Sequence, residues 1–172
     1  MAGQDLPEWV QRYLAEDIPG IELMPQYQDS YVFVGEALGT NNKALEQWAA
    51  GFTVAQDLPQ LVAVRVQARL TAAVSGSPDV AYGRYFEQVI KGAADIRYTG
   101  ARKETDFWLL KRYTGEDDGA DRDIYAFYVL VGIDKTALRE QLNTILNGVQ
   151  TDLTREQSAA ITRLRDNFYN GF

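Results

Sequence analysis

The chain has 172 residues, of which 46% are hydrophobic and 24% are charged, and this length and composition are typical of one globular domain with a sizeable core. Its formal net charge of −7 disfavours binding to nucleic acid, because phosphates repel an acidic surface. Cysteine and histidine are both absent, which excludes disulfides, thiol nucleophiles, the usual zinc sites and Ser-His-Asp triads.

No stretch of the sequence reaches the run of about 18 apolar residues that a membrane-spanning helix needs. Residues 1–5 lack the basic start and the apolar core of a signal peptide. Two alternatives follow. The protein is cytoplasmic, or it is the remainder of an exported protein from which a targeting segment was removed.

The first third of the sequence predicts helices at residues 6–17 and 40–57 and a strand at 31–39. Both helices carry apolar side chains at steps of three and four, and the loop at 18–30 contains two prolines. The second helix is expected to end near residue 57, because Pro59 disfavours helical conformation in the residue before it.

Residues 60–74 are compatible with two structures. Valines at every second position from Val62 to Val66 favour a strand, with Arg65 and Arg69 on its polar face. Gln, Ala, Arg and Leu in the second half of the segment favour a helix. We expect a strand and keep the helix as the alternative.

A Ser-Gly-Ser-Pro sequence at 75–78 separates this segment from a predicted helix at 79–92, which Gly92 is expected to end. Two strands are then predicted, at 94–102 and 105–113. They follow each other through a short connection, which favours antiparallel pairing.

The segment Ile124–Asp134, IYAFYVLVGID, is the most apolar of the chain. Both of its alternating sets are apolar or aromatic, so it predicts a central strand covered on both faces. Asp134 is placed to cap the helix that follows, and Thr154 with Gln157 forms the capping box of a C-terminal helix.

These elements predict an α+β fold in a single domain, with a mainly antiparallel sheet and helices packed against it. We expect three segments: an N-terminal helix and loop at 1–30, the α+β core at 31–149, and a C-terminal helix at 150–172 that packs on or extends from the core.

The acidic residues offer two candidate sites of chemistry. The loop at 116–123 is rich in Asp, but it lacks the spacing of a calcium-binding loop and is expected to be a solvated turn. Glu104 and Asp106 are the candidate bases of a carboxylate hydrolase, a hypothesis that requires one of them to be buried in a cleft. Because no supporting group accompanies them, we expect no catalytic residue, no metal and no cofactor.

Aromatic residues are plentiful, and some are candidates for a contact surface or the lining of a pocket. The surface that we predict comprises Trp9, Tyr13, Tyr82 and Tyr85. Phe86 and Trp108 are further candidates, and the alternative place for all of them is a well-filled core.

The order of several segments resembles a known family. Pro7 and Trp9 come first, then YVFVGEA at 31–37 and an Ala-rich helix, then FEQVIKGA at 86–93, a strand with Trp108, and YAFYVLVGID. This order, over residues 7–147, is similar to the LPP-type bacterial surface lipoprotein family, whose relatives include flagellar outer-membrane ring and disk proteins.

The resemblance implies a non-enzymatic, envelope-associated interaction or scaffolding module, with protein partners and a tendency to self-associate. Such proteins are usually anchored through a lipidated N-terminal cysteine, which this chain lacks. The alternatives are a carrier of a small apolar ligand, whose pocket would have to be left open by Phe52, Phe86 and Phe127, and the carboxylate hydrolase.

Overall fold

The computed structural model describes residues 5–73, 80–113, 121–149 and 153–172. The chain forms two compact units, and each consists of two chain segments. The sheet unit contains residues 1–57 and 99–135, and the helical unit contains residues 58–98 and 136–172. The predicted α+β class is confirmed, and the unit boundaries fall at places other than the expected 30/31 and 149/150.

The sheet has three antiparallel strands in the order β1-β3-β2. They are β1 (Ser30–Gly39), β2 (Ala101–Tyr113) and β3 (Arg122–Asp134). The prediction that the most apolar segment forms the central strand is confirmed, since every residue from 126 to 133 is buried. Burial of both faces explains why both alternating sets of β3 are apolar.

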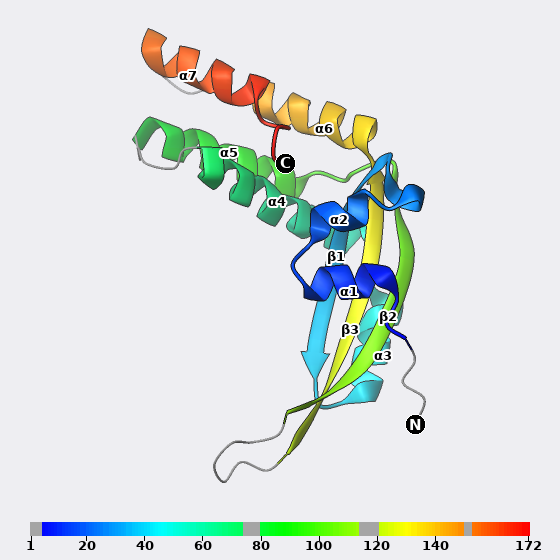
Figure 1. Cartoon of the computed structure of the whole chain (residues 1–172). Helices are drawn as coiled ribbons and strands as arrows, with labels where there is room; N and C mark the ends of the chain where they lie inside the picture. The colour runs from blue at the N-terminus through cyan, green and yellow to red at the C-terminus, as the bar shows by residue number, and fades with distance from the viewer. Residues whose placement is uncertain (1–4, 74–79, 114–120, 150–152) are drawn as a thin grey trace. The chain divides into compact units, whose positions relative to one another are not determined.

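Helices cover both faces of this sheet (Figure 1). On one face lie α1 (Glu8–Leu14), α2 (Ile18–Glu22) and the 3-10 helix η1 (Pro25–Tyr27), packed on alternate β3 residues that include Ala126, Tyr128 and Leu130. On the other face lies α3 (Asn42–Gly51), which packs on Phe127 and is capped by the side chain of Asn41. α2 and η1 occupy the segment expected to be a loop.

Residues 60–74 are helical, so the expectation of a strand is wrong. Helix α4 spans Val54–Ala73, and α3 ends at Gly51 rather than near residue 57. The buried residues Leu58, Val62, Val66 and Leu70 recur every four positions and form one stripe of a helix. Burial of this stripe stabilises the helix more than pairing in a sheet would stabilise a strand with alternating valines. Pro59 is tolerated one turn into the helix, where it removes a single amide donor.

The helical unit combines most of α4 with α5 (Val80–Asp95), α6 (Lys135–Gly148) and α7 (Arg155–Asp166). Each helix contributes buried apolar side chains, among them Leu70, Val89, Leu142 and Ile161. The predicted capping box at the start of α7 is confirmed, with both of its hydrogen bonds present.

The strand expected at 94–102 is also wrong, because α5 continues to Asp95 and β2 begins only at Ala101. Gly92 lies inside α5, not at its end, and a Cβ there would come within 2.9 Å of Ile145 of α6. Arg65 and Arg69 lie on a helix rather than on a strand, and they donate to backbone carbonyls at the end of the chain, at Phe172 and Phe168 respectively.

Candidate interaction surface

The structure places the four predicted surface residues in different environments. Trp9 is 6% exposed and Tyr85 is fully buried, so the expectation that they form a contact surface is wrong for both. Each lies on the apolar side of its helix, where burial of a large ring stabilises the fold more than exposure would. The side chain of Tyr82 lies outside the described residues. Of the three predicted residues whose side chains the structure describes, only Tyr13 is half-buried.

Tyr13 belongs to a polar cluster at the edge of the sheet unit. Its hydroxyl donates to Glu36 Oε2 at 2.6 Å, and its ring meets that of Tyr128 edge-on at 5.4 Å. Burial, followed by the bond to Glu36, raises the pKa of Tyr13. Among the described residues, the Tyr128 hydroxyl has no hydrogen-bond partner of good geometry. Tyr128 raises the pKa of Lys111, whose Nζ lies 5.9 Å from the centroid of the Tyr128 ring. These contacts join α1 to the sheet.

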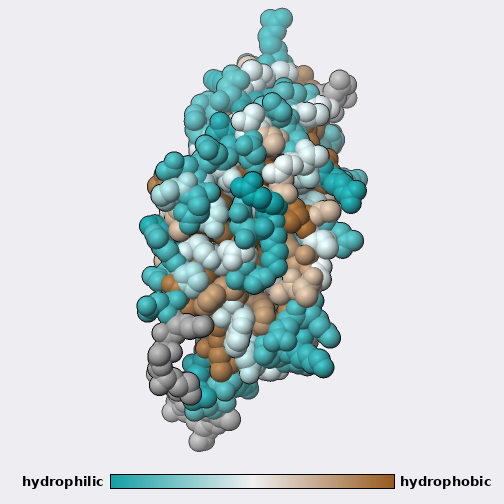
Figure 2. All heavy atoms as spheres, turned by 90° about the vertical axis from the view of Figure 1, so that its right-hand side faces the viewer, coloured by the Kyte–Doolittle hydropathy of each residue, from teal (hydrophilic) through white to brown (hydrophobic). Residues whose placement is uncertain are grey.

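The face of the sheet that α3 covers is left open over β2. α3 lies against β1 and β3, whereas Trp108 and Leu110 of β2 remain 49% and 45% exposed. Trp108 stacks on Phe127 with ring centroids 5.8 Å apart and planes 13° apart, and Tyr125 lies 6.1 Å away. Apolar groups therefore reach solvent from a layer whose inner residues are well packed. Figure 2 shows the side of the molecule with β2, where brown apolar atoms lie at the surface among hydrophilic ones.

Charged residues flank the two apolar ones on the same face of β2. Asp106, Trp108, Leu110 and Arg112 alternate along the strand and lie opposite Val129, Phe127, Tyr125 and Asp123 of β3. We name these four β2 residues the β2 strip. Arg112 pairs with Asp123 at 2.9 Å, and Asp106 pairs with Lys103 at 2.5 Å, with the charged groups largely exposed to water.

β2 is an edge strand. Within the described part of the chain, no strand pairs with its outer side and no backbone hydrogen bond reaches it from outside the sheet. Its pairing with β3 shifts register once, at Glu104, and is regular from Thr105 to Tyr113. Edge strands are usually blunted by charges, prolines or bulges. The centre of β2, Phe107–Leu110, has none of these and is free to pair with another strand.

The two candidate catalytic carboxylates lie in ion pairs with neighbours on their own strand. Glu104 accepts from Arg102 at 2.7 Å at the irregularity of β2, and Asp106 is half exposed. The side chain of Glu104 is 18% exposed and that of Asp106 is 53% exposed, so of the two only Glu104 approaches the burial that the hydrolase hypothesis requires. Among the residues with described positions, no group of three acidic side chains could hold a metal ion. Most of the acidic loop at 116–123 lies outside those residues, and its Asp123 pairs with Arg112.

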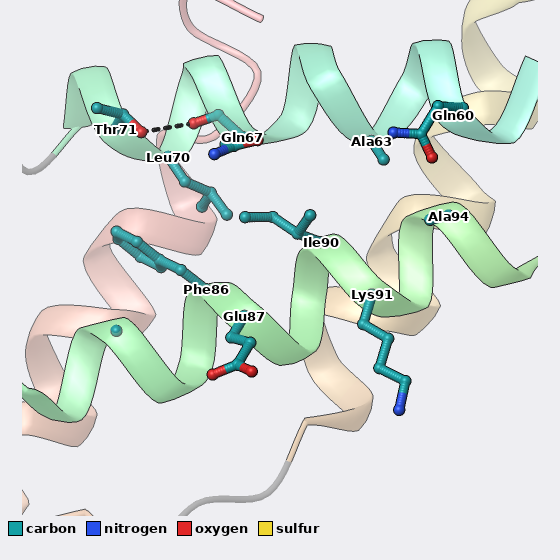
Figure 3. Close-up of a pocket in the computed structure, with 11 residues that line it drawn as sticks. Gln60, Ala63, Gln67, Leu70, Thr71, Phe86, Glu87, Ile90, Lys91 and Ala94 are labelled. Atoms are coloured by element: carbon teal, nitrogen blue, oxygen red, sulfur yellow. Dashed lines mark hydrogen bonds between the residues drawn. The ribbon is translucent and has the colours of Figure 1, made fainter.

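A cavity of about 570 Å³ lies between α4 and α5 of the helical unit. Figure 3 shows Leu70 and Ile90 pointing toward each other across it, with Phe86 beside them and the polar Glu87 and Lys91 on the rim. Three phenylalanine rings were expected to decide whether a pocket is open. Phe127 is buried in the sheet unit. Phe52 packs so closely on Gly35 that a Cβ atom on residue 35 would lie 2.7 Å from the Phe52 ring. Only Phe86 lines this cavity.

Comparison of the chain with protein-family models, with curated proteins and with solved structures finds no match. No helix of the described ranges is both long and apolar enough to cross a bilayer. The sequence analysis named Trp108 as a candidate for a contact surface and Asp106 only as a candidate base, and it missed Leu110 and Arg112. The signal was the alternation of Asp106, Trp108, Leu110 and Arg112, which places all four on one face of a strand.

Proposed function

We propose that the protein is a non-enzymatic interaction module that docks on a protein partner through the β2 strip. The observation that carries this proposal is the half-exposed indole of Trp108, which stacks on Phe127. Rigid aromatic side chains at the centre of a patch are enriched among the residues that contribute most to protein interfaces. The charged ends of the strip supply a polar rim.

The energy that such a contact offers follows from the exposure of Trp108. A fully buried aromatic side chain removes about 150–250 Å² from water, so covering the exposed half of Trp108 removes roughly 100 Å² more. At ~25 cal/mol per Å² this contributes about 2.5 kcal/mol, which is typical of a residue that dominates a protein interface. Leu110 adds a smaller area of the same kind.

We further propose that the module belongs to the bacterial cell envelope, as the soluble part of a lipoprotein. The support for this placement is the resemblance to LPP-type surface lipoproteins, and the segments YVFVGEA and YAFYVLVGID that carry it form β1 and β3 of the sheet unit. Fractionation of cells of the natural source tests it. Recovery of the protein with the envelope is expected, and recovery in the cytoplasm would refute the placement.

The docking proposal is tested by a photo-reactive amino acid placed at Leu110 in those cells. We expect a covalent adduct with a protein at this position. Leu23 provides the matched control, since it is an apolar residue of the same unit and is 76% exposed but lies directly after the end of α2, away from β2 in the sequence. Absence of an adduct at Leu110, or equal yields at the two positions, would rule out docking through the β2 strip.

The cavity between α4 and α5 supports a second function, that of a carrier for a small apolar ligand. Its volume lies within the roughly 300–1,000 Å³ of ligand pockets, and Leu70, Phe86 and Ile90 line it. Native mass spectrometry of gently isolated protein would detect a bound lipid or cofactor of small mass. The variant Ile90→Trp is expected to fill the cavity and abolish that species, and a wild-type spectrum without any adduct would exclude the carrier function.

A further inference from the structure

We infer that the β2 strip docks on a second copy of this chain, so that two β2 strands pair antiparallel about a two-fold axis at Leu109 and join two three-stranded sheets. This inference rests on the proposed docking function and names its partner. It follows from the open edge of β2 and from the order of residues along it.

The residues of the β2 strip are complementary to themselves when the strand is reversed. Residues directly opposite in an antiparallel pair lie on the same face of the sheet. With the axis at Leu109, Asp106 lies opposite Arg112 of the second copy, and Trp108 lies opposite its Leu110. The symmetry repeats both pairs, so the interface gains two contacts between opposite charges and two apolar contacts over Trp108.

The other face of β2 accepts the same arrangement. Phe107 and Leu109 are half-buried and Lys111 is partly exposed on that face, where they lie opposite Tyr128, Ala126 and Ile124 of β3. Across the axis Leu109 meets its own copy and Phe107 lies opposite Lys111, which can place its cation over the ring. No pair of like charges arises on either face between Thr105 and Tyr113.

The length of the regular pairing selects the same axis. The β2–β3 pairing is uninterrupted from Thr105 to Tyr113, and Leu109 is the midpoint of that segment. An axis at Trp108 would place Asp106 opposite Leu110, and an axis at Leu110 would place Arg112 opposite Trp108. Each of these alternatives sets a charge against an apolar residue, and each also shortens the paired segment.

Charge reversal at the two ends of the strip tests the inference. Light scattering after size exclusion, over about 1–200 µM protein, is expected to show a monomer–dimer equilibrium for the wild type. In a dimer of the Asp106→Arg variant, both pairs between positions 106 and 112 become pairs of two arginines. In a dimer of the Arg112→Asp variant, both become pairs of two aspartates. Each variant alone is expected to dimerise at least tenfold more weakly, because two attractive pairs become repulsive.

A mixture of the two variants distinguishes the proposed pairing from any other surface. A copy with Asp106→Arg is complementary to a copy with Arg112→Asp at both ends, so the mixture is expected to form a heterodimer of wild-type strength. Arg102→Asp is the matched control on the same strand, outside the paired segment, and it should leave dimerisation unchanged. Tryptophan fluorescence confirms that every variant is folded.

The outcomes separate this inference from the docking function. A wild type that stays monomeric at every concentration refutes the second copy as partner, and a cross-link from Leu110 to a different protein would then leave the docking function intact. Variants that dimerise as strongly as the wild type refute it as well, because the dimer must use another surface. Absence of both the dimer and the cross-link refutes both proposals.

Discussion

Val129→Asp is expected to unfold the sheet unit at neutral pH. Val129 is fully buried on the central strand, between Gly35 of β1 and Asp106 of β2. The substitution loses the burial of a valine, about 1.5–3 kcal/mol, and adds the cost of an unpaired buried polar group, about 1–3 kcal/mol even when the new carboxyl stays protonated. The sum, about 2.5–6 kcal/mol, reaches the lower end of the total stability of a domain, about 5–15 kcal/mol, and ionisation of the carboxyl at neutral pH adds to it.

The pH dependence separates the charge from the loss of packing. Burial and the facing Asp106 carboxylate both raise the pKa of the introduced carboxyl in the folded state above the unfolded value of about 3.9. Below that value the carboxyl is protonated in both states and adds no charge penalty. As the pH rises above about 4, the unfolded state ionises first, and the variant loses up to ~1.4 kcal/mol per pH unit until the folded pKa is reached.

Tryptophan fluorescence is the assay of choice, because Trp9, Trp48 and Trp108 all lie in the sheet unit. Urea titrations at about pH 3.5 and pH 7 would compare the variants, and a variant that is already unfolded at one pH would show no cooperative transition there. Val129→Asn is the control, since it has the same shape and no charge. We expect the two variants to be similar at the lower pH and the Asp variant to be much weaker at pH 7. Equal pH dependence of both, or a wild-type midpoint for Val129→Asp, would refute the assignment of this position to a covered central strand.

Three further substitutions test other contacts. Tyr85→Phe should destabilise the helical unit by about 1–3 kcal/mol in far-UV circular dichroism, because the buried hydroxyl donates to the Leu146 carbonyl, and Tyr169→Phe should cost less because its hydroxyl is exposed. Thr154→Ala removes the capping box of α7 and should lower stability by ~1 kcal/mol, with Thr154→Ser near wild type. Burial raises the pKa of Tyr98, so stability should fall above about pH 10 as the unfolded tyrosine ionises, and Tyr98→Phe should reduce this alkaline loss relative to wild type.

Local sequence patterns correctly predicted those elements whose own residues show how they are buried or capped. The central strand β3 was visible because both of its faces are apolar, and the start of α7 was visible because Thr154 and Gln157 satisfy each other's backbone groups. Helix α4 was misjudged because Val62, Val64 and Val66 fit a strand equally well. Val64 is 57% exposed, and only contacts with distant helices show that the stripe with a period of four decides the structure.

The sequence indicates which residues share a face in the β2 strip, but it does not indicate that this face is exposed. The alternation of Asp106, Trp108, Leu110 and Arg112 is local, and it places these residues on one face of a strand. Whether that face is covered depends on the strand order and on where α3 lies, which are both set by pairings between remote segments. For the same reason Trp9 and Tyr85 seemed suitable for a surface, although both pack in a core.

The interleaving of the two units determines the order in which the chain can fold. β2 and β3 are joined by a short connection, so their hairpin can form early, whereas Gly39 of β1 must find Tyr125 across α3, α4, α5 and β2. Closing so long a loop slows folding, because entropy is lost before the contact is gained. On the ribosome, β1 and α3 must therefore wait for β3 to be synthesised. During that interval the uncovered β1 is the segment most exposed to aggregation, and a chaperone that binds it would raise the yield of native protein.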